Sequence, residues 1–175
     1  GAKGAAGAWA GLGRVSGEEG VGTWLVVGGR GSGWSGGARP VREPGWPGQT
    51  DVWLRGLDLT TRALTGSEQV LWNGALLGAV WAEGPHLYKV EGRYYLLAAE
   101  GGTEHHHAVS VARAQEVIGP YAGNPGSPVL THRHLGHDHP IAGTGQADLV
   151  ALPAGTGWAA RSAPRPSRGF NPNRG

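Results

Sequence analysis

The sequence contains neither cysteine nor methionine among its 175 residues. Without cysteine, a disulfide framework, a thiolate metal site and a thiol nucleophile are all excluded. Because a natural reading frame starts with methionine, we expect this sequence to be a piece of a longer protein. It shows no apolar run long enough to cross a membrane and no secretion signal, so the compartment stays open between secreted and cytoplasmic.

Charge of either sign is also sparse. Charged residues make up 16% of the chain, the formal net charge is +2 and the sequence pI is about 9.3. No basic stripe is interleaved with aromatic residues, which is the pattern that nucleic-acid binding surfaces show. We therefore expect neither a nucleic-acid partner nor a membrane partner. Much of the small arginine excess lies near the C-terminus, at Arg161, Arg165, Arg168 and Arg174.

Glycine is abundant, and its distribution divides the chain. Sixteen of the 34 glycines lie within residues 1–50, where apolar periodicity is almost absent. Only residues 23–27 are expected to form a strand there, and residues 28–37 and 39–48 are expected to be loops. We therefore predict a Gly-rich degenerate or disordered segment over residues 1–50 and a folded domain over residues 51–175.

From Asp51 onward, short apolar runs alternate with turn residues. The Glu91-Gly92 pair separates two aromatic, alternating runs, which predicts a hairpin. Short strands with turn signals about every eight to twelve residues, and no convincing helix, indicate an all-β protein. A sandwich, a barrel or a set of propeller blades would each fit. The expected strands are residues 51–59, 68–72, 86–90, 93–99, 108–113, 129–131, 148–152 and 158–160.

One corner near the middle of the chain carries the first candidate for chemistry. Glu83 lies between Trp81 and the Gly84-Pro85 pair, where glycine permits a tight bend and proline fixes its own φ. A carboxyl group on a stiff corner beside a large aromatic ring is partly desolvated, which raises its pKa and suits it to donate a proton. The alternative is a solvated glutamate before an ordinary turn.

Seven of the eight histidines form two clusters, at residues 105–107 and within residues 132–139 around Asp138. Imidazoles at this density fit zinc, copper or nickel. However, consecutive side chains on a strand alternate between faces, so three adjacent histidines cannot all reach one metal without a bend. The alternative is a polar loop lining.

Several segments of residues 51–175 also keep a characteristic order and spacing. They are Asp51-Val52-Trp53-Leu54, Val70-Leu71-Trp72-Asn73-Gly74, Glu83-Gly84-Pro85-His86, Tyr94-Tyr95-Leu96-Leu97, Gly119-Pro120-Tyr121, Thr131-His132-Arg133-His134 and Ala147-Asp148-Leu149-Val150. In these segments the chain resembles glycoside hydrolase family 43, the β-xylosidase and α-L-arabinofuranosidase family, with the corner at Glu83 as the most specific part. The resemblance implies a five-bladed β-propeller, of which this chain would form about blades two to four.

The resemblance also implies a reaction, the hydrolysis of xylosides or arabinosides with inversion at the anomeric carbon. Family members use a glutamate general acid, which Glu83 matches, an aspartate general base and a second aspartate that tunes the pKa of the acid. The base lies in an Asp-Pro motif that this chain lacks, and residues 1–50 contain no aspartate. We therefore expect the chain alone to be inactive. The implied substrate is a plant cell-wall oligosaccharide or an aryl glycoside.

Four further residues fall in segments that line the site in the family: Trp81, His107, His132 and Gln146. Trp81 would offer a flat apolar face to a sugar ring, and its alternative role is packing between blades. Gln146 stands where many relatives carry a histidine that helps to hold calcium or water. We therefore expect no cofactor, although the resemblance leaves calcium open as a weaker alternative, because glutamine is a poorer ligand than histidine. Two other functions stay open, a non-catalytic carbohydrate-binding module and a His-rich metal-binding protein.

Overall fold

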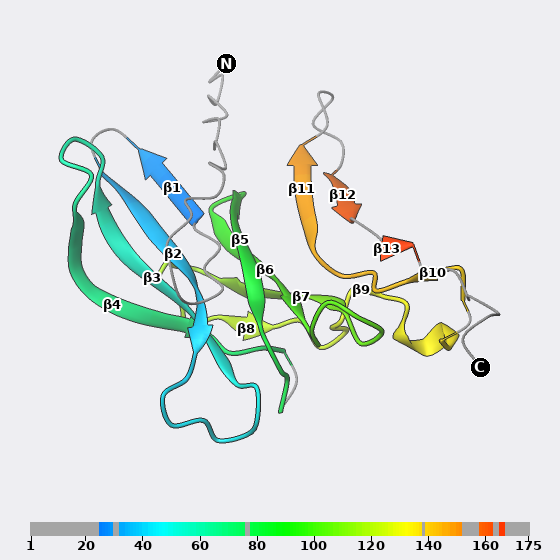
Figure 1. Ribbon diagram of the computed structural model, residues 1–175. Coiled ribbons are helices and arrows are strands. Elements are labelled where there is room, and N and C mark those ends of the chain that lie inside the picture. The colour runs from blue at the N-terminus through cyan, green and yellow to red at the C-terminus, as the bar shows by residue number, and fades with distance from the viewer. Residues whose placement is uncertain are drawn as a thin grey trace, which may run out of the picture.

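The computed structural model describes residues 25–29, 32–75, 78–137, 139–151, 158–162 and 165–166. Strands dominate these residues, and the helical part of them is the short 3-10 helix η1 at Arg133–Leu135 (Figure 1). The all-β prediction is therefore confirmed. No helix in this described part is long and apolar enough to cross a membrane.

The first sheet is an antiparallel meander in the order β1-β2-β3-β4. Along β3, residues alternate between buried and half-buried positions, which brings Val52 and Leu54 to one face. β4 is an edge strand, and it is exposed until its last two residues, Leu71 and Trp72. The strands span Leu25–Gly29 (β1), Ser32–Pro40 (β2), Thr50–Asp58 (β3) and Leu64–Trp72 (β4).

The structure corrects the prediction of a loop at residues 28–37, whereas the loop predicted at residues 39–48 is confirmed except for its first two residues, which end β2. β1 runs to Gly29, and β2 pairs with β3 along its whole length, from Ser32 with Asp58 to Pro40 with Thr50. Glycine has a low strand propensity, but here its small size is used, because a Cβ atom on Gly36 would lie 2.3 Å from a backbone carbonyl oxygen of β3. Pairing with a good strand overrides the local preference. The proposed division of the chain at residue 50 stays a prediction.

The second sheet follows the order β5-β6-β7-β8, with β9 also paired to β7. The hairpin predicted at Glu91-Gly92 is confirmed, since Val90 pairs with Arg93 across the turn. Both turn residues have positive φ, 49° and 81°, as a two-residue turn of the primed type requires. The strands span Glu83–Val90 (β5), Arg93–Glu100 (β6), Ala108–Ala114 (β7), Ala122–Gly123 (β8) and Leu130–Thr131 (β9).

The last described strands form two short pairs beyond β9 (Figure 1). β11 and β12 form an antiparallel hairpin, which confirms the pair of strands predicted near residues 148–152 and 158–160. A two-residue contact joins β10 to β13. The bounds are Ile141–Ala142 (β10), Ala147–Ala151 (β11), Trp158–Ser162 (β12) and Arg165–Pro166 (β13).

The hydrophobic core occupies both faces of the second sheet. One cluster joins Val52 and Leu54 of β3 to Leu96 of β6, and another joins Leu97 of β6 to Ala147 of β11. Neighbouring residues of a strand point to opposite faces, so β6 has a neighbouring sheet on each side. Successive meander sheets packed face to face are the arrangement of propeller blades. The chain therefore folds as part of a β-propeller.

Candidate active site

The corner before β5 is bent by unusual backbone angles. Trp81 and Gly84 both have positive φ, 50° and 52°. The pairing of β5 with β6 shifts register between Glu83 and His86, which is the signature of a β-bulge. Proline has no N–H to contribute to the ladder, so Pro85 fits such an interruption. The bulge turns Glu83 out of the regular alternation at the very start of the strand.

Hydrogen bonds from distant segments hold this corner in place. Three of its carbonyl oxygens and one of its N–H groups have partners on the segment between β2 and β3, at the first residue of β3 or just after β6. Such bonds fix the backbone that leads into Glu83 before any ligand arrives. The four bonds are Trp46 Nε1–H to Ala79 O (2.7 Å), Gly101 N–H to Val80 O (2.8 Å), Trp81 N–H to Gly48 O (2.7 Å) and Thr50 Oγ1–H to Ala82 O (2.9 Å).

Glu83 itself is half-buried, as the sequence predicted for this corner. Burial raises the pKa of its carboxyl group above the ordinary value of 4.5. Desolvation disfavours the charged form, so the neutral carboxylic acid persists to a higher pH than it does on an exposed glutamate. A carboxyl group of this kind can donate a proton, which is the chemistry of a general acid.

Trp81 and Gln146 both lie beside the Glu83 corner. The indole ring of Trp81 packs on Gly102, where a Cβ atom would lie 3.0 Å from Cε3, and the residue is 49% exposed. An exposed ring on a fixed corner leaves an apolar face open to a ligand. The Gln146 side chain approaches Gly84, whose Cβ position is 3.5 Å from its Nε2 atom. The structure thus brings the corner next to Gln146, the residue that precedes β11.

His107 is buried and makes contacts with the backbone rather than with solvent. The Gln146 N–H group donates to its Nε2 atom (3.4 Å), so Nδ1 carries the proton and donates to the Gly143 carbonyl oxygen (2.9 Å). Its ring lies against Gly145, where a Cβ atom would be 2.1 Å away. These contacts give His107 a role in positioning residues 143–146, and direct sugar contact by His107 stays a prediction.

His132 lies farther along the chain, at the residue before η1. Its Nδ1 atom binds the Ile141 carbonyl oxygen at 3.1 Å, and its ring contacts the edge of His139 with 5.5 Å between centroids. His105 and His137 stack at 3.8 Å. Among the residues that the structure describes, which leave out Asp138, no group of three potential ligands could hold a metal ion.

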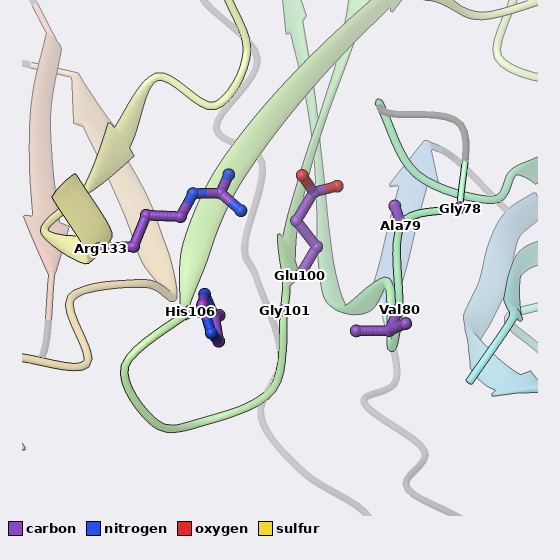
Figure 2. Close-up of a pocket in the computed structure, with 7 residues that line it drawn as sticks. All are labelled: Gly78, Ala79, Val80, Glu100, Gly101, His106 and Arg133. Carbon is purple, nitrogen blue, oxygen red and sulfur yellow. The ribbon is translucent and has the colours of Figure 1, made fainter. Parts of the chain in front are cut away.

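Sequence reasoning missed the residues that hold the corner and a pocket beside it. Trp46 and Thr50 donate hydrogen bonds to residues more than thirty positions away in the sequence, and no local sequence pattern predicts such a contact. The pocket, about 230 Å³ in volume, lies where the end of β6 meets residues 78–80 and η1 (Figure 2). It contains Glu100 and Arg133, and its only sequence signal is a carboxylate that ends a strongly apolar strand.

Comparison with known proteins decides the family. The family model for glycosyl hydrolases family 43 matches residues 2–175. This chain belongs to glycosyl hydrolase family 43. The family-43 chain is 45% identical over 122 residues to a xylosidase/arabinosidase of Butyrivibrio fibrisolvens, covering 70% of this chain and 24% of that protein. It is 42% identical over 93 residues to a non-reducing end alpha-L-arabinofuranosidase of Bacteroides ovatus, covering 53% and 17%.

Solved family-43 structures share the fold of this chain. A xylan beta-1,4-xylosidase from Bacillus halodurans C-125 matches with a TM-score of 0.72 and 28% identity, over 82% of this chain and 27% of that one. A protein from a capybara gut metagenome matches with a TM-score of 0.65 and 33% identity, over 69% and 23%. The family-43 chain therefore spans about a quarter of the length of these relatives, as part of their propeller.

Proposed function

We propose that this chain supplies the acid-bearing part of a glycoside hydrolase that cleaves xylosides or arabinosides with inversion, with Glu83 as the general acid. The observation that carries the proposal is the position of Glu83, half-buried on a corner whose backbone is held by four long-range hydrogen bonds. The names of the relatives support the substrate class, because both are xylosidases or arabinofuranosidases.

In an inverting reaction the acid protonates the leaving oxygen while a base on the other face of the sugar activates a water. Glu83 would give the proton, Trp81 would receive the apolar face of the ring, and Gln146 would hydrogen-bond a hydroxyl group. One carboxylate cannot fill both catalytic roles, because acid and base stand about 6.5–9.5 Å apart. Since the sequence offers no match for the family's base or for its second aspartate, we expect the chain alone to hydrolyse little.

The test uses chromogenic β-xyloside and α-L-arabinofuranoside substrates. The chain is assayed alone and as a replacement for the aligned segment of the Butyrivibrio fibrisolvens enzyme. We expect activity in the chimaera and a loss of about 10²–10⁴-fold on Glu83→Gln. The matched control is Glu91→Gln, which changes an exposed turn glutamate and leaves the rate unchanged. A Glu83→Gln chimaera with full activity would refute the acid assignment.

A carbohydrate-binding module without catalysis is the second candidate, and the exposure of the Trp81 ring favours it. An exposed aromatic face binds sugar rings whether or not an acid stands beside it. This candidate predicts binding of xylo-oligosaccharides that survives Glu83→Gln and is lost on Trp81→Ala, with no hydrolysis by the chimaera. Hydrolysis that depends on Glu83 would exclude it.

A further inference from the structure

The pocket of about 230 Å³ beside the corner has no part in the chemistry proposed for Glu83. Glu83 pairs with Ala99 across β5 and β6, and Glu100 is the next residue of β6. Because successive side chains of a strand point to opposite faces, the Glu100 carboxylate lies on the other side of the sheet from the partner of Glu83. Glu83 does not line the pocket, which is thus separate from the proposed acid although both share the same backbone corner.

Glu100 is a buried carboxylate with an unused oxygen. It is 2% exposed, and its Oε2 atom accepts the Ala75 N–H group at 3.3 Å. Its Oε1 atom is buried and has no hydrogen-bond partner among the described residues. A buried carboxylate oxygen without a donor is unfavourable, so native proteins nearly always supply one. We therefore expect a hydrogen-bond donor next to the Oε1 atom of Glu100 inside the pocket.

Arg133 stands on the opposite wall. Figure 2 shows its guanidinium group and the Glu100 carboxylate extending toward each other across the pocket. Within the described residues the two side chains form no ion pair, and the guanidinium has no acceptor. A buried acceptor thus faces a set of donors, with room for a small molecule between them.

The pairing of these groups selects the chemistry of the occupant. An anion would be repelled by Glu100, and a metal or organic cation would be repelled by Arg133. A neutral group with adjacent hydroxyls satisfies both, because one hydroxyl donates to Oε1 and its neighbour accepts from the guanidinium. We propose that this pocket binds the vicinal hydroxyl groups of a sugar ring, as a second carbohydrate site separate from Glu83.

The size and walls of the pocket fit one ring. Its volume lies below the roughly 300–1,000 Å³ of pockets for drug-sized ligands, which suits a monosaccharide unit. Ala79 and Val80 supply an apolar wall for the C–H face of that unit. The inference rests on the proposed function for its ligand class, since a protein that handles xylosides meets pentose rings at high local concentration.

The test is a titration of the ¹⁵N-labelled chain with methyl β-D-xylopyranoside, followed by amide chemical shifts. We expect saturable shifts at Gly101, His106 and Arg133, the residues at the pocket. Arg133→Ala is expected to weaken this binding at least tenfold, and Arg133→Lys to recover part of it. Arg113→Ala, which removes an exposed arginine of β7 outside the pocket, is the matched control and should bind like the unchanged chain.

Other outcomes separate this site from the proposed reaction. Shifts confined to Gly84 and Gln146, unchanged by Arg133→Ala, would overturn the pocket and still support sugar binding near Glu83. Shifts caused by inorganic phosphate or by Ca²⁺, but not by the xyloside, would make the pocket an ion site and overturn the proposal. The absence of any shift, in a chain whose dispersed spectrum shows that it is folded, would also overturn the proposal. Pocket binding that persists while the chimaera fails to hydrolyse substrate would instead refute only the proposed function.

Discussion

At the scale of single residues, the protonation of Glu83 sets the expected pH dependence of catalysis. Only the neutral carboxyl group can donate a proton, and burial raises its pKa above 4.5. We therefore expect kcat/KM of the chimaera to fall as pH rises through that raised pKa, so that the alkaline limb lies above pH 4.5. A pH–rate profile measures this, and Glu83→Gln should remove the limb together with most of the rate.

The raised pKa of Glu83 also determines the direction in which the free energy of unfolding changes with pH. The folded state holds the Glu83 proton more tightly than the unfolded state does, so the free energy of unfolding falls as pH rises between the two pKa values. Urea unfolding of the chain at several pH values should show this decline, and the Glu83→Gln chain should lack that part of it. An identical pH dependence in both chains would contradict a raised pKa.

Gly145 is expected to tolerate no side chain. A Cβ atom there would lie 2.1 Å from the ring of His107, which is held on both sides by backbone hydrogen bonds and cannot move away freely. We expect Gly145→Ala to lower the free energy of unfolding by about 1–3 kcal/mol, as overpacking does. Gly126→Ala is the control, because its nearest neighbour is at 3.5 Å. Equal stability of the two variants would show that His107 is free to shift.

At the scale of elements, the interface between the first two sheets carries much of the stability. Leu54 of β3 is 1% exposed and belongs to the cluster that joins these sheets. We expect Leu54→Ala to cost about 2–5 kcal/mol in urea unfolding, from lost burial and the cavity left behind. Leu59→Ala, at a residue 38% exposed, should stay within about 0.5 kcal/mol. A similar loss in both would mean that the sheets do not pack through Leu54.

The element scale also shows what sequence patterns predict and what they miss. Strands such as β3 and β7 were predictable because alternation and turn residues are local signals. β2 was not, because Gly33, Gly36 and Gly37 favour no local structure and acquire one only by pairing with β3. The proposal for Glu83 came from its motif, whereas the Glu100 pocket depends on contacts between residues far apart in the sequence.

At the scale of the molecule, the second sheet is joined to β11 by polar contacts as well as by the core. Tyr88 of β5 donates its hydroxyl proton to the Asp148 carboxylate and accepts the Leu149 N–H group at 2.9 Å. His86 of β5 lies 3.7 Å from the same carboxylate. Burial and the neighbouring carboxylate raise the pKa of Tyr88, so its hydroxyl stays protonated as a donor. These bonds tie β5 to β11, next to Gln146.

Removing the Tyr88 hydrogen bonds should destabilise the β11–β12 hairpin without unfolding the other sheets. Tyr88→Phe keeps the ring and deletes the hydroxyl, leaving the half-buried Leu149 N–H without that acceptor at a cost of about 1 kcal/mol. We expect amide hydrogen exchange of β11 and β12 to quicken severalfold, while β2 and β3 keep their protection. Tyr95→Phe, in β6 and outside this network, is the control. If exchange quickened equally in all sheets, the blades would unfold as one unit, and the tie would stabilise the whole chain rather than the junction beside Gln146.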